Sequence, residues 1–406
     1  MTMDRETFYR EARHDLAGPL HGIRVLDVTK VWSGPVATAI LADLGADVIR
    51  VEMPGNREGL LPPDIPGTGL SWFRQSLQRN KRSVSLDLRR PGAARVFMAL
   101  VATADVLVEN YRPGTLDEWG VGYQGCRKAK PDLVFVSISG YGQYGPASQR
   151  PGYDPATQAA AGWMALNGGD SPRRAPTFLA NDIAGLHATI GTLAALRHRD
   201  VTGEGQHVDV AMLDALLAAS DGYLTLAAAG DPPQPWGNQT DSVVPANCYR
   251  CSDGYVYLAV ALNKHWRTLT ELMGRPELGR AEGYATNDAR RVNREQVDAL
   301  VAEWLADRTA EQAQTLLDQH GLVAQRVRSL AEVAKDPHVL ERDMLQETVL
   351  SNGTMAPLTG PAVKFSRTPT RVRSAAPDPG TDTDEILDGL GFDAQARAAL
   401  RADKVI

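Results

Sequence analysis

The first half of the chain alternates short apolar runs with amphipathic segments. The apolar runs predict five strands, over residues 23–28, 48–52, 83–88, 106–109 and 133–139. Amphipathic segments over residues 36–44 and 91–102 predict helices between these strands. The alternation predicts an α/β fold, with a mostly parallel, Rossmann-like sheet and helices on both of its faces. Ligands of such folds bind beyond the carboxyl ends of the strands.

The pattern changes after residue 229, where a loop rich in glycine and proline begins. Apolar runs over residues 246–250 and 255–261 flank a Ser-Asp-Gly turn and predict a hairpin. Helical patterns follow over residues 264–273, 294–306 and 311–320, and an extended strap over 366–381 precedes two short helices. We predict a large α/β domain over residues 1–229, a small α+β domain over 230–327, and a return segment over 328–406 that completes the large domain.

One aspartate stands at the predicted start of a helix. Ile183, Leu186, Ile190 and Leu193 recur at helical spacing and predict a helix over residues 183–199. Asp182 then falls at the N-cap, where free backbone amides and the helix dipole are expected to keep its carboxylate ionised. An ionised carboxylate can attack an activated acyl group. An aspartate at an N-cap is more often only a cap, so this segment alone leaves both interpretations open.

Two glycine-containing loops follow predicted strands. The segment TKVWSGP at 29–35 leads into a helix, a junction that suits a phosphate or an oxyanion. It lacks the glycines of a dinucleotide fingerprint, because Gly34 stands alone. The turn SGYGQYG at 139–145 could line an acyl group with its amides or form only a tight loop. Tyr153 and Asp154 precede a predicted helix over 155–166, either as caps or as residues that position a substrate.

Arginines recur in the loops that follow the predicted strands, among them Arg57, Arg89 and Arg112. Convergent cations near aromatic side chains suit a ligand with several phosphates and a flat base. Each of these arginines by itself is more often a solvated surface charge. Their recurrence at strand ends favours a shared binding site.

Composition narrows the class of protein. The 406 residues are 43% hydrophobic and carry a net charge of −6, which argues against binding nucleic acid or an anionic membrane. No run of about 18 apolar residues occurs, so we expect no membrane span. Three cysteines predict a reducing, cytoplasmic location without disulfides. They are too few for a zinc site without other ligands, and we expect no metal.

Taken together, these segments resemble the class III CoA-transferases, the family of formyl-CoA transferase and its carnitine and succinyl-CoA relatives. The order and spacing of the shared motifs carry the resemblance, which spans about residues 20–369. The matching motifs are LHGIRVLD (20–27), GP (34–35), LGADVIRVE (44–52), NKRSVSLDL (80–88), ADVLVENYRPG (104–114), RPGYD (150–154), GEGQHVDVAMLD (203–214), YATN (284–287) and DPHV (336–339).

The resemblance implies that Asp182 is the nucleophile, that coenzyme A or acyl-CoA binds as a substrate without a permanent cofactor, and that two interlocked rings form a homodimer. The residues that we expect to position the substrate are Trp32, Gly140, Tyr141, Gly142, Tyr153 and Asp154. The implied CoA contacts are Trp32, Ser33, Met53, Leu86, Asp87, Leu88, Arg89, Asn110, Tyr111, Arg112, Pro151, Gly152, Tyr153 and Asp154. Arg57 is the candidate substitute for a cation that formyl-CoA transferase has at Met53.

We therefore expect CoA to move from an acyl-CoA thioester to a small free carboxylic acid through an aspartyl-CoA thioester. Trp32 replaces a glutamine of formyl-CoA transferase, which disfavours oxalate and favours a longer acyl group such as succinyl. An acyl-CoA racemase or isomerase is one alternative, but Tyr153 stands where the racemase branch has a histidine. A non-catalytic acyl-CoA-binding subunit is the other alternative, and Asp182 counts against it.

Overall fold

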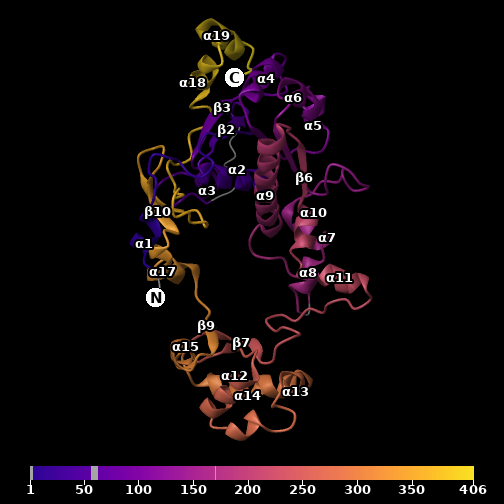
Figure 1. The fold of residues 1–406 in the computed structure, drawn as a ribbon, viewed down its shortest axis with the longest axis vertical. Coiled ribbons are helices and arrows are strands. Elements are labelled where there is room, and N and C mark those ends of the chain that lie inside the picture. The colour runs from indigo at the N-terminus through magenta and orange to yellow at the C-terminus, as the bar shows by residue number, and fades with distance from the viewer. Residues whose placement is uncertain (1–2, 56–62, 170) are drawn as a thin grey trace. The chain divides into compact units, whose positions relative to one another are not determined.

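The computed structural model describes residues 3–55, 63–169 and 171–406 (Figure 1). The chain forms two compact units, each with its own core. The large unit contains the chain up to residue 163, residues 175–231 and residues 337–406. The small unit contains residues 164–174 and 232–336.

A parallel six-stranded sheet forms the centre of the large unit, which confirms the predicted fold class. Its strands are β1 (Arg24–Asp27), β2 (Asp47–Glu52), β3 (Lys81–Ser85), β4 (Val106–Glu109), β5 (Val134–Ser139) and β6 (His207–Ala211). The spatial order is β3-β2-β1-β4-β5-β6. The order therefore reverses between β1 and β4, which is the switch point where open α/β sheets bind their ligands.

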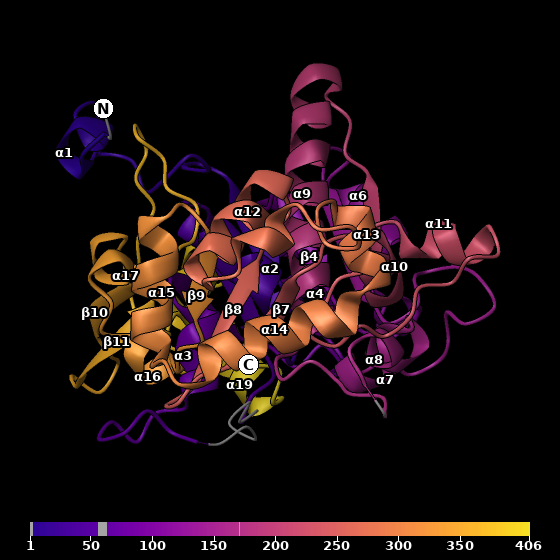
Figure 2. The same ribbon diagram turned by 90° about the horizontal axis from the view of Figure 1, so that it is seen from below.

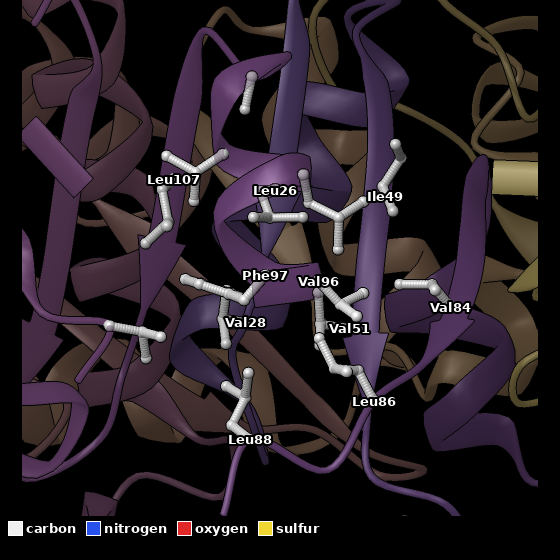
Figure 3. Close-up of a cluster of buried hydrophobic side chains, with 14 of the residues drawn as sticks. Leu26, Val28, Ile49, Val51, Val84, Leu86, Leu88, Val96, Phe97 and Leu107 are labelled. Carbon is white, nitrogen blue, oxygen red and sulfur yellow. The ribbon is translucent and has the colours of Figure 1, made fainter. Parts of the chain in front are cut away.

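Strand side chains alternate between two buried layers, one on each face of the sheet. On one face, Leu26, Ile49 and Leu107 meet Val96 and Phe97 of a covering helix (Figure 3). The helices that cover this face are α4 (Ala93–Ala102), α6 (Tyr123–Ala129) and α18 (Thr383–Gly389). Those that cover the other face are α2 (Ser33–Asp43), α9 (Leu179–Thr202) and α10 (Met212–Ala218).

Helix α9 buries its small residues rather than the apolar stripe that predicted it. Leu186, Ile190 and Leu193 are 52%, 62% and 38% exposed. The buried face carries alanines and Gly185, where an added Cβ would lie 3.0 Å from the Ser33 carbonyl oxygen. Close approach to α2 thus selects small residues on this face and leaves the stripe outside.

The remaining helices of the large unit are short. The single helix expected over residues 155–166 is two helices, because Gly162 adopts a φ of 79° between them. These two helices are α7 (Asp154–Ala160) and α8 (Trp163–Leu166), and residues 164–166 of α8 belong to the small unit. The other elements of the large unit outside the sheet are α1 (Arg5–Tyr9), α3 (Trp72–Gln78), α5 (Thr115–Glu118), α11 (Tyr223–Ala228), α17 (Pro337–Glu341) and α19 (Ala394–Ala402), with the hairpin β10 (Leu345–Val349) and β11 (Met355–Thr359).

The strap over residues 366–381 contains no helix or strand, as predicted, and the segment that it begins closes the free edge of the sheet. The Asn80 side-chain oxygen accepts from the Arg373 amide. The backbone N–H groups of Ser83 and Ser85 donate to the side chains of Asp382 and Thr383, at 2.7 and 2.9 Å. At the edge of the sheet, these backbone N–H groups of β3 therefore bond to side chains and are not left free to pair with another strand.

The small unit packs helices on a three-stranded antiparallel sheet of order β7-β8-β9 (Figures 1 and 2). The hairpin of β7 (Ala246–Arg250) and β8 (Tyr255–Ala259) confirms the predicted one, whereas β9 (Val323–Arg326) was not predicted. The other elements are α12 (Asn263–Leu272), the 3₁₀ helix η1 (Pro276–Gly279), α13 (Asn287–Val292), α14 (Arg294–Ala306), α15 (Ala310–Gln319) and α16 (Leu330–Val333). Within the described ranges, no helix is both long and apolar enough to cross a membrane.

Candidate active site

Two cavities lie at the carboxyl ends of the strands, on either side of the switch point, and Lys30 and Tyr111 line both. The β2-side cavity is lined by Val28, Thr29, Lys30, Arg50, Val51, Glu52, Met53, Leu86, Leu88, Arg89, Tyr111 and Trp119. The β5-side cavity is lined by Lys30, Val31, Trp32, Ser33, Asn110, Tyr111, Arg112, Pro113, Ile138, Ser139, Gly140, Ser148, Arg150, Pro151, Gly152, Tyr153, Asp154, Asn181 and Met212. The position of both cavities is the one expected for a ligand of this topology.

The β2-side cavity gathers several of the expected CoA contacts, with Met53, Leu86 and Leu88 in its wall. Arg89 is the exposed cation at this cavity, and the buried Asp87 carboxylate holds its guanidinium through two bonds of 2.8 and 2.9 Å. Asp87 thus orients a cation instead of facing the cavity. Arg57 lies outside the described residues.

The β5-side cavity contains the other expected contacts, including Ser33, Asn110 and Pro151. Its wall depends on a close approach of two glycines: a Cβ added to Gly140 would lie 2.6 Å from the Cα of Gly152. The remaining predicted residues in this wall are Trp32, Arg112, Tyr153 and Asp154, together with Gly140, Gly152 and the shared Tyr111. Tyr141 and Gly142 are absent from the described lining.

The turn at 139–142 uses its donors internally. The Gly142 amide donates to the Ser139 hydroxyl at 2.8 Å, and the Gln143 amide donates to the Asp209 carboxylate at 2.9 Å. These two amides are therefore occupied and do not point an unused donor at a substrate. Of the two readings of this turn, the hydrogen bonds favour the tight loop.

Asp182 lies inside the first turn of α9 rather than at its N-cap, so the predicted cap position is wrong. The N-cap is Phe178, and the Asp182 amide already donates to the Phe178 carbonyl at 2.9 Å. The helix begins four residues earlier than predicted because a distant side chain caps it. The buried Asp154 carboxylate accepts from the Asn181 amide at 3.0 Å and from the Gln158 side chain at 2.6 Å. A carboxylate that accepts first-turn amides stabilises a helix start.

The helix start does not hold the Asp182 carboxylate in its ordinary ionisation range. Burial raises the pKa of Asp182, the hydrogen bond from Trp32 lowers it, and the negative charge of Asp154 raises it further, with a net upward shift. Among the described residues, no helix amide donates a hydrogen bond to this carboxylate, in contrast to the predicted N-cap arrangement. The donor that favours the anion is the Trp32 indole, whose Nε1 lies 2.6 Å from Asp182 Oδ1.

Two features hold Trp32 against Asp182. The loop before it is clamped by Asn110, whose side chain accepts from the Lys30 amide and donates to the Lys30 carbonyl, both at 2.7 Å. The ring of Trp32 packs against Phe178 with 4.6 Å between centroids. The sequence carried no signal for either contact, because both join segments far apart in the chain. Phe73 and Trp72 complete the aromatic cluster around Trp32, at 5.1 and 5.6 Å.

A parallel sheet of Rossmann order, with two cation-bearing cavities at its switch point and a half-buried carboxylate bonded to Trp32 in the wall of one of them, is typical of α/β proteins that bind small-molecule ligands. Comparison with known proteins specifies the class. A family model described as CoA-transferase family III matches residues 20–383. The succinyl-CoA:mesaconate CoA-transferase of Haloarcula marismortui is 34% identical, over 93% of this chain and 97% of its own length.

Two further comparisons agree with this match. The human succinyl-CoA:glutarate CoA-transferase is 32% identical, over 96% of this chain and 90% of its own. The crystal structure of a CaiB/BaiF family protein from Brucella suis superposes with a TM-score of 0.82 and 31% identity, over 92% of this chain and 100% of its own. The chain belongs to CoA-transferase family III, and it is an enzyme with CoA-transferase activity.

Proposed function

We propose that the enzyme transfers CoA from succinyl-CoA to a small dicarboxylic acid through an aspartyl-CoA thioester on Asp182. The observation that carries this proposal is the position of the Asp182 carboxylate. It is half-buried, follows Asn181 in the chain and is bonded to Trp32; Asn181 and Trp32 line the β5-side cavity, whereas Asp182 itself is not in its described lining. Within the described ranges only its Oδ1 has a hydrogen-bond donor. Oδ2 is therefore available as a nucleophile toward an acyl group in that cavity.

The raised pKa of Asp182 suits this chemistry. A carboxylate that is partly desolvated loses less solvation when it attacks, and so is a better nucleophile than a fully hydrated one. The acyl-aspartyl anhydride and the aspartyl-CoA thioester that follow are chemically close to the substrates, so each exchange can be reversible.

The CoA moiety is proposed to lie across both cavities, which share Lys30 and Tyr111. Arg89, oriented by Asp87, and Arg112 are the proposed contacts of the CoA phosphates. Charge-assisted contacts of a guanidinium with phosphate are among the strongest in proteins.

The dicarboxylate is proposed from two independent grounds. The large ring of Trp32 lies where the acyl group is proposed to bind. A site with this ring is not expected to fit the small oxalyl group closely, so oxalate should be a poor substrate. The similar enzymes named above act on succinyl-CoA with mesaconate or glutarate as partner acids. Both acids carry two carboxylates, of which only one takes part in the exchange.

The test has two stages. The enzyme is incubated with succinyl-CoA alone and quenched with acid. Mass spectrometry of the protein then detects a covalent CoA adduct, and peptide mapping should locate that adduct on Asp182. Acceptor acids are then compared at equal concentration with one donor: oxalate, C4 to C6 dicarboxylates and aromatic acids. The absence of an adduct, or oxalate as the best acceptor by kcat/KM, would refute the mechanism or the substrate class, respectively. Deuterium entering the α carbon without transfer would instead support a racemase.

We also propose that the enzyme is a homodimer. The exposed apolar stripe of Leu186, Ile190 and Leu193 on α9 is a surface that a monomer would leave in water. The interlocked rings that the family resemblance implies cannot separate without unfolding. Sedimentation at low concentration should therefore detect no reversible monomer, and a monomer population in native buffer would contradict the ring topology.

A further inference from the structure

Among the described residues, the indole of Trp32 donates the hydrogen bond that the carboxylate of the proposed nucleophile accepts. Its Nε1 lies 2.6 Å from Asp182 Oδ1, and these two residues are separated by 150 positions in the chain. An indole N–H can only donate a hydrogen bond, so this contact always presents a proton to an electron-rich oxygen. The geometry distinguishes the two carboxylate oxygens, with Oδ1 held and Oδ2 open.

The backbone places this donor at a cost. Val31, directly before Trp32, has a φ of 62°, a left-handed conformation that is strained for a β-branched residue. The Asn110 clamp on Lys30 and the ring contact with Phe178 hold the loop in that conformation. Strain that surrounding contacts maintain is often found where a side chain must be aimed.

Two amides of the neighbouring glycine turn are not available as donors for acyl transfer. Its Gly142 and Gln143 amides are already bonded to Ser139 and Asp209. Within the described ranges, Trp32 is the side chain that donates to the Asp182 carboxylate.

We propose that the Trp32 indole is the oxyanion donor for the two steps in which a nucleophile attacks Cγ of Asp182. This inference rests on the proposed aspartyl-CoA mechanism. Negative charge that develops on Oδ1 in these steps falls on an oxygen that already faces the N–H. Donors aimed in advance at a developing oxyanion lower the barrier to acyl transfer.

The bonds and charges of the two steps balance without a proton transfer. In the first step, the CoA thiolate attacks Cγ of the acyl-aspartyl anhydride, and the carbonyl electron pair moves to Oδ1. As the pair returns, the Cγ–O bond to the donor acid breaks, which leaves the aspartyl-CoA thioester and a free carboxylate. In the second step, the acceptor carboxylate attacks Cγ, Oδ1 again takes the charge, and the Cγ–S bond breaks to release the thiolate.

The test substitutes the indole while keeping an aromatic ring. Trp32→Phe should lower kcat by about 10²–10³-fold, the effect of losing one oxyanion donor, with little change in KM for succinyl-CoA. The quantity to follow is the rate at which the aspartyl-CoA adduct forms after rapid mixing with succinyl-CoA alone. Because the indole bond lowers the pKa of Asp182, its loss should also move the acid limb of the pH–rate profile to higher pH.

Trp72→Phe is the matched control. It removes an indole N–H from the same aromatic cluster, where that N–H has no hydrogen-bond partner among the described residues. Its kcat should stay within about threefold of wild type. Trp32→Gln restores a donor without the ring and should recover part of the rate that Trp32→Phe loses, which a merely structural role for the ring would not allow.

The outcomes separate the two proposals. A wild-type enzyme that forms no aspartyl-CoA adduct refutes the proposed function and this inference with it. A wild-type enzyme that forms the adduct, beside a folded Trp32→Phe that forms it equally fast, overturns the role of Trp32 alone. A Trp32→Gln variant slower than Trp32→Phe would overturn it as well, because it would show that the ring and not the donor matters.

Discussion

The two loops that follow β1 and β5 look alike in sequence and differ in how they use their hydrogen-bond donors. Both contain glycine and follow a strand; the first was expected to suit a phosphate or an oxyanion, and the second either to line an acyl group or to form only a tight loop. After β1, the loop is strained at Val31 and clamped by Asn110, and it sends the Trp32 N–H outward to Asp182. After β5, the Gly142 and Gln143 amides are bonded within the fold.

The difference shows that glycine content by itself does not identify an oxyanion site. A loop can stabilise developing charge only with donors that the fold has left unused and aimed. The β1 loop has such a donor because Asn110 satisfies the backbone around it. The β5 turn satisfies its own amides and serves as a wall, through the contact of Gly140 with Gly152.

The largest expected effect comes from Asp182, the residue that accepts the hydrogen bond from the β1 loop. Asp182→Ala removes the proposed nucleophile, so transfer should fall by about 10⁴-fold or more. Binding of CoA, measured by calorimetry, should persist, because the proposed phosphate contacts lie elsewhere. A variant with near-normal kcat would show that Asp182 is not the nucleophile.

The second effect should come from the clamp. Asn110→Ala frees Lys30 on both sides and lets Trp32 shift, and displacements of about 1 Å at an active site can cost about 10²-fold. We expect kcat to fall by about 10- to 100-fold in steady-state assays with succinyl-CoA. An unchanged kcat would mean that the β1 loop keeps its conformation without Asn110.

The third effect concerns binding rather than the chemical step. Arg89→Ala removes the cation that Asp87 orients, and should raise KM for the acyl-CoA by about tenfold while kcat changes less. Arg90→Ala is the control, because its contact to Asp87 is longer, at 3.6 Å, and Arg90 is not in the described cavity lining. Equal KM values for the two variants would place the phosphates elsewhere.

The smallest effect should come from the β5 turn. Asp209→Ala removes the acceptor of the Gln143 amide and should lower the free energy of unfolding by about 1 kcal/mol, with kcat within about threefold of wild type. Denaturant titration and the transfer assay measure the two quantities. A large fall in kcat with intact stability would give the β5 turn the direct catalytic role that its hydrogen bonds argue against.

Local sequence patterns predicted the sheet better than they predicted the site. Buried apolar runs report strands directly, although β6 was missed because His207 and Asp209 interrupt its apolar pattern. The start of α9 was misplaced because its cap is the Asp154 carboxylate, 27 residues before Asn181. Family resemblance pointed to Trp32 and Asp182 separately. Their hydrogen bond spans 150 positions, and no local pattern reports such a contact.

The capped edge of β3 has a consequence for the order of folding. The groups that close this edge, Asp382 and Thr383, lie 299 and 298 residues after the strand donors that they bond. A chain growing from its N-terminus therefore carries an open, pairing-competent strand for most of its synthesis. Contacts of such long range are entropically slow to form. The segment after residue 366 thus protects the sheet against edge-to-edge aggregation, and this protection begins only once that segment has been synthesised.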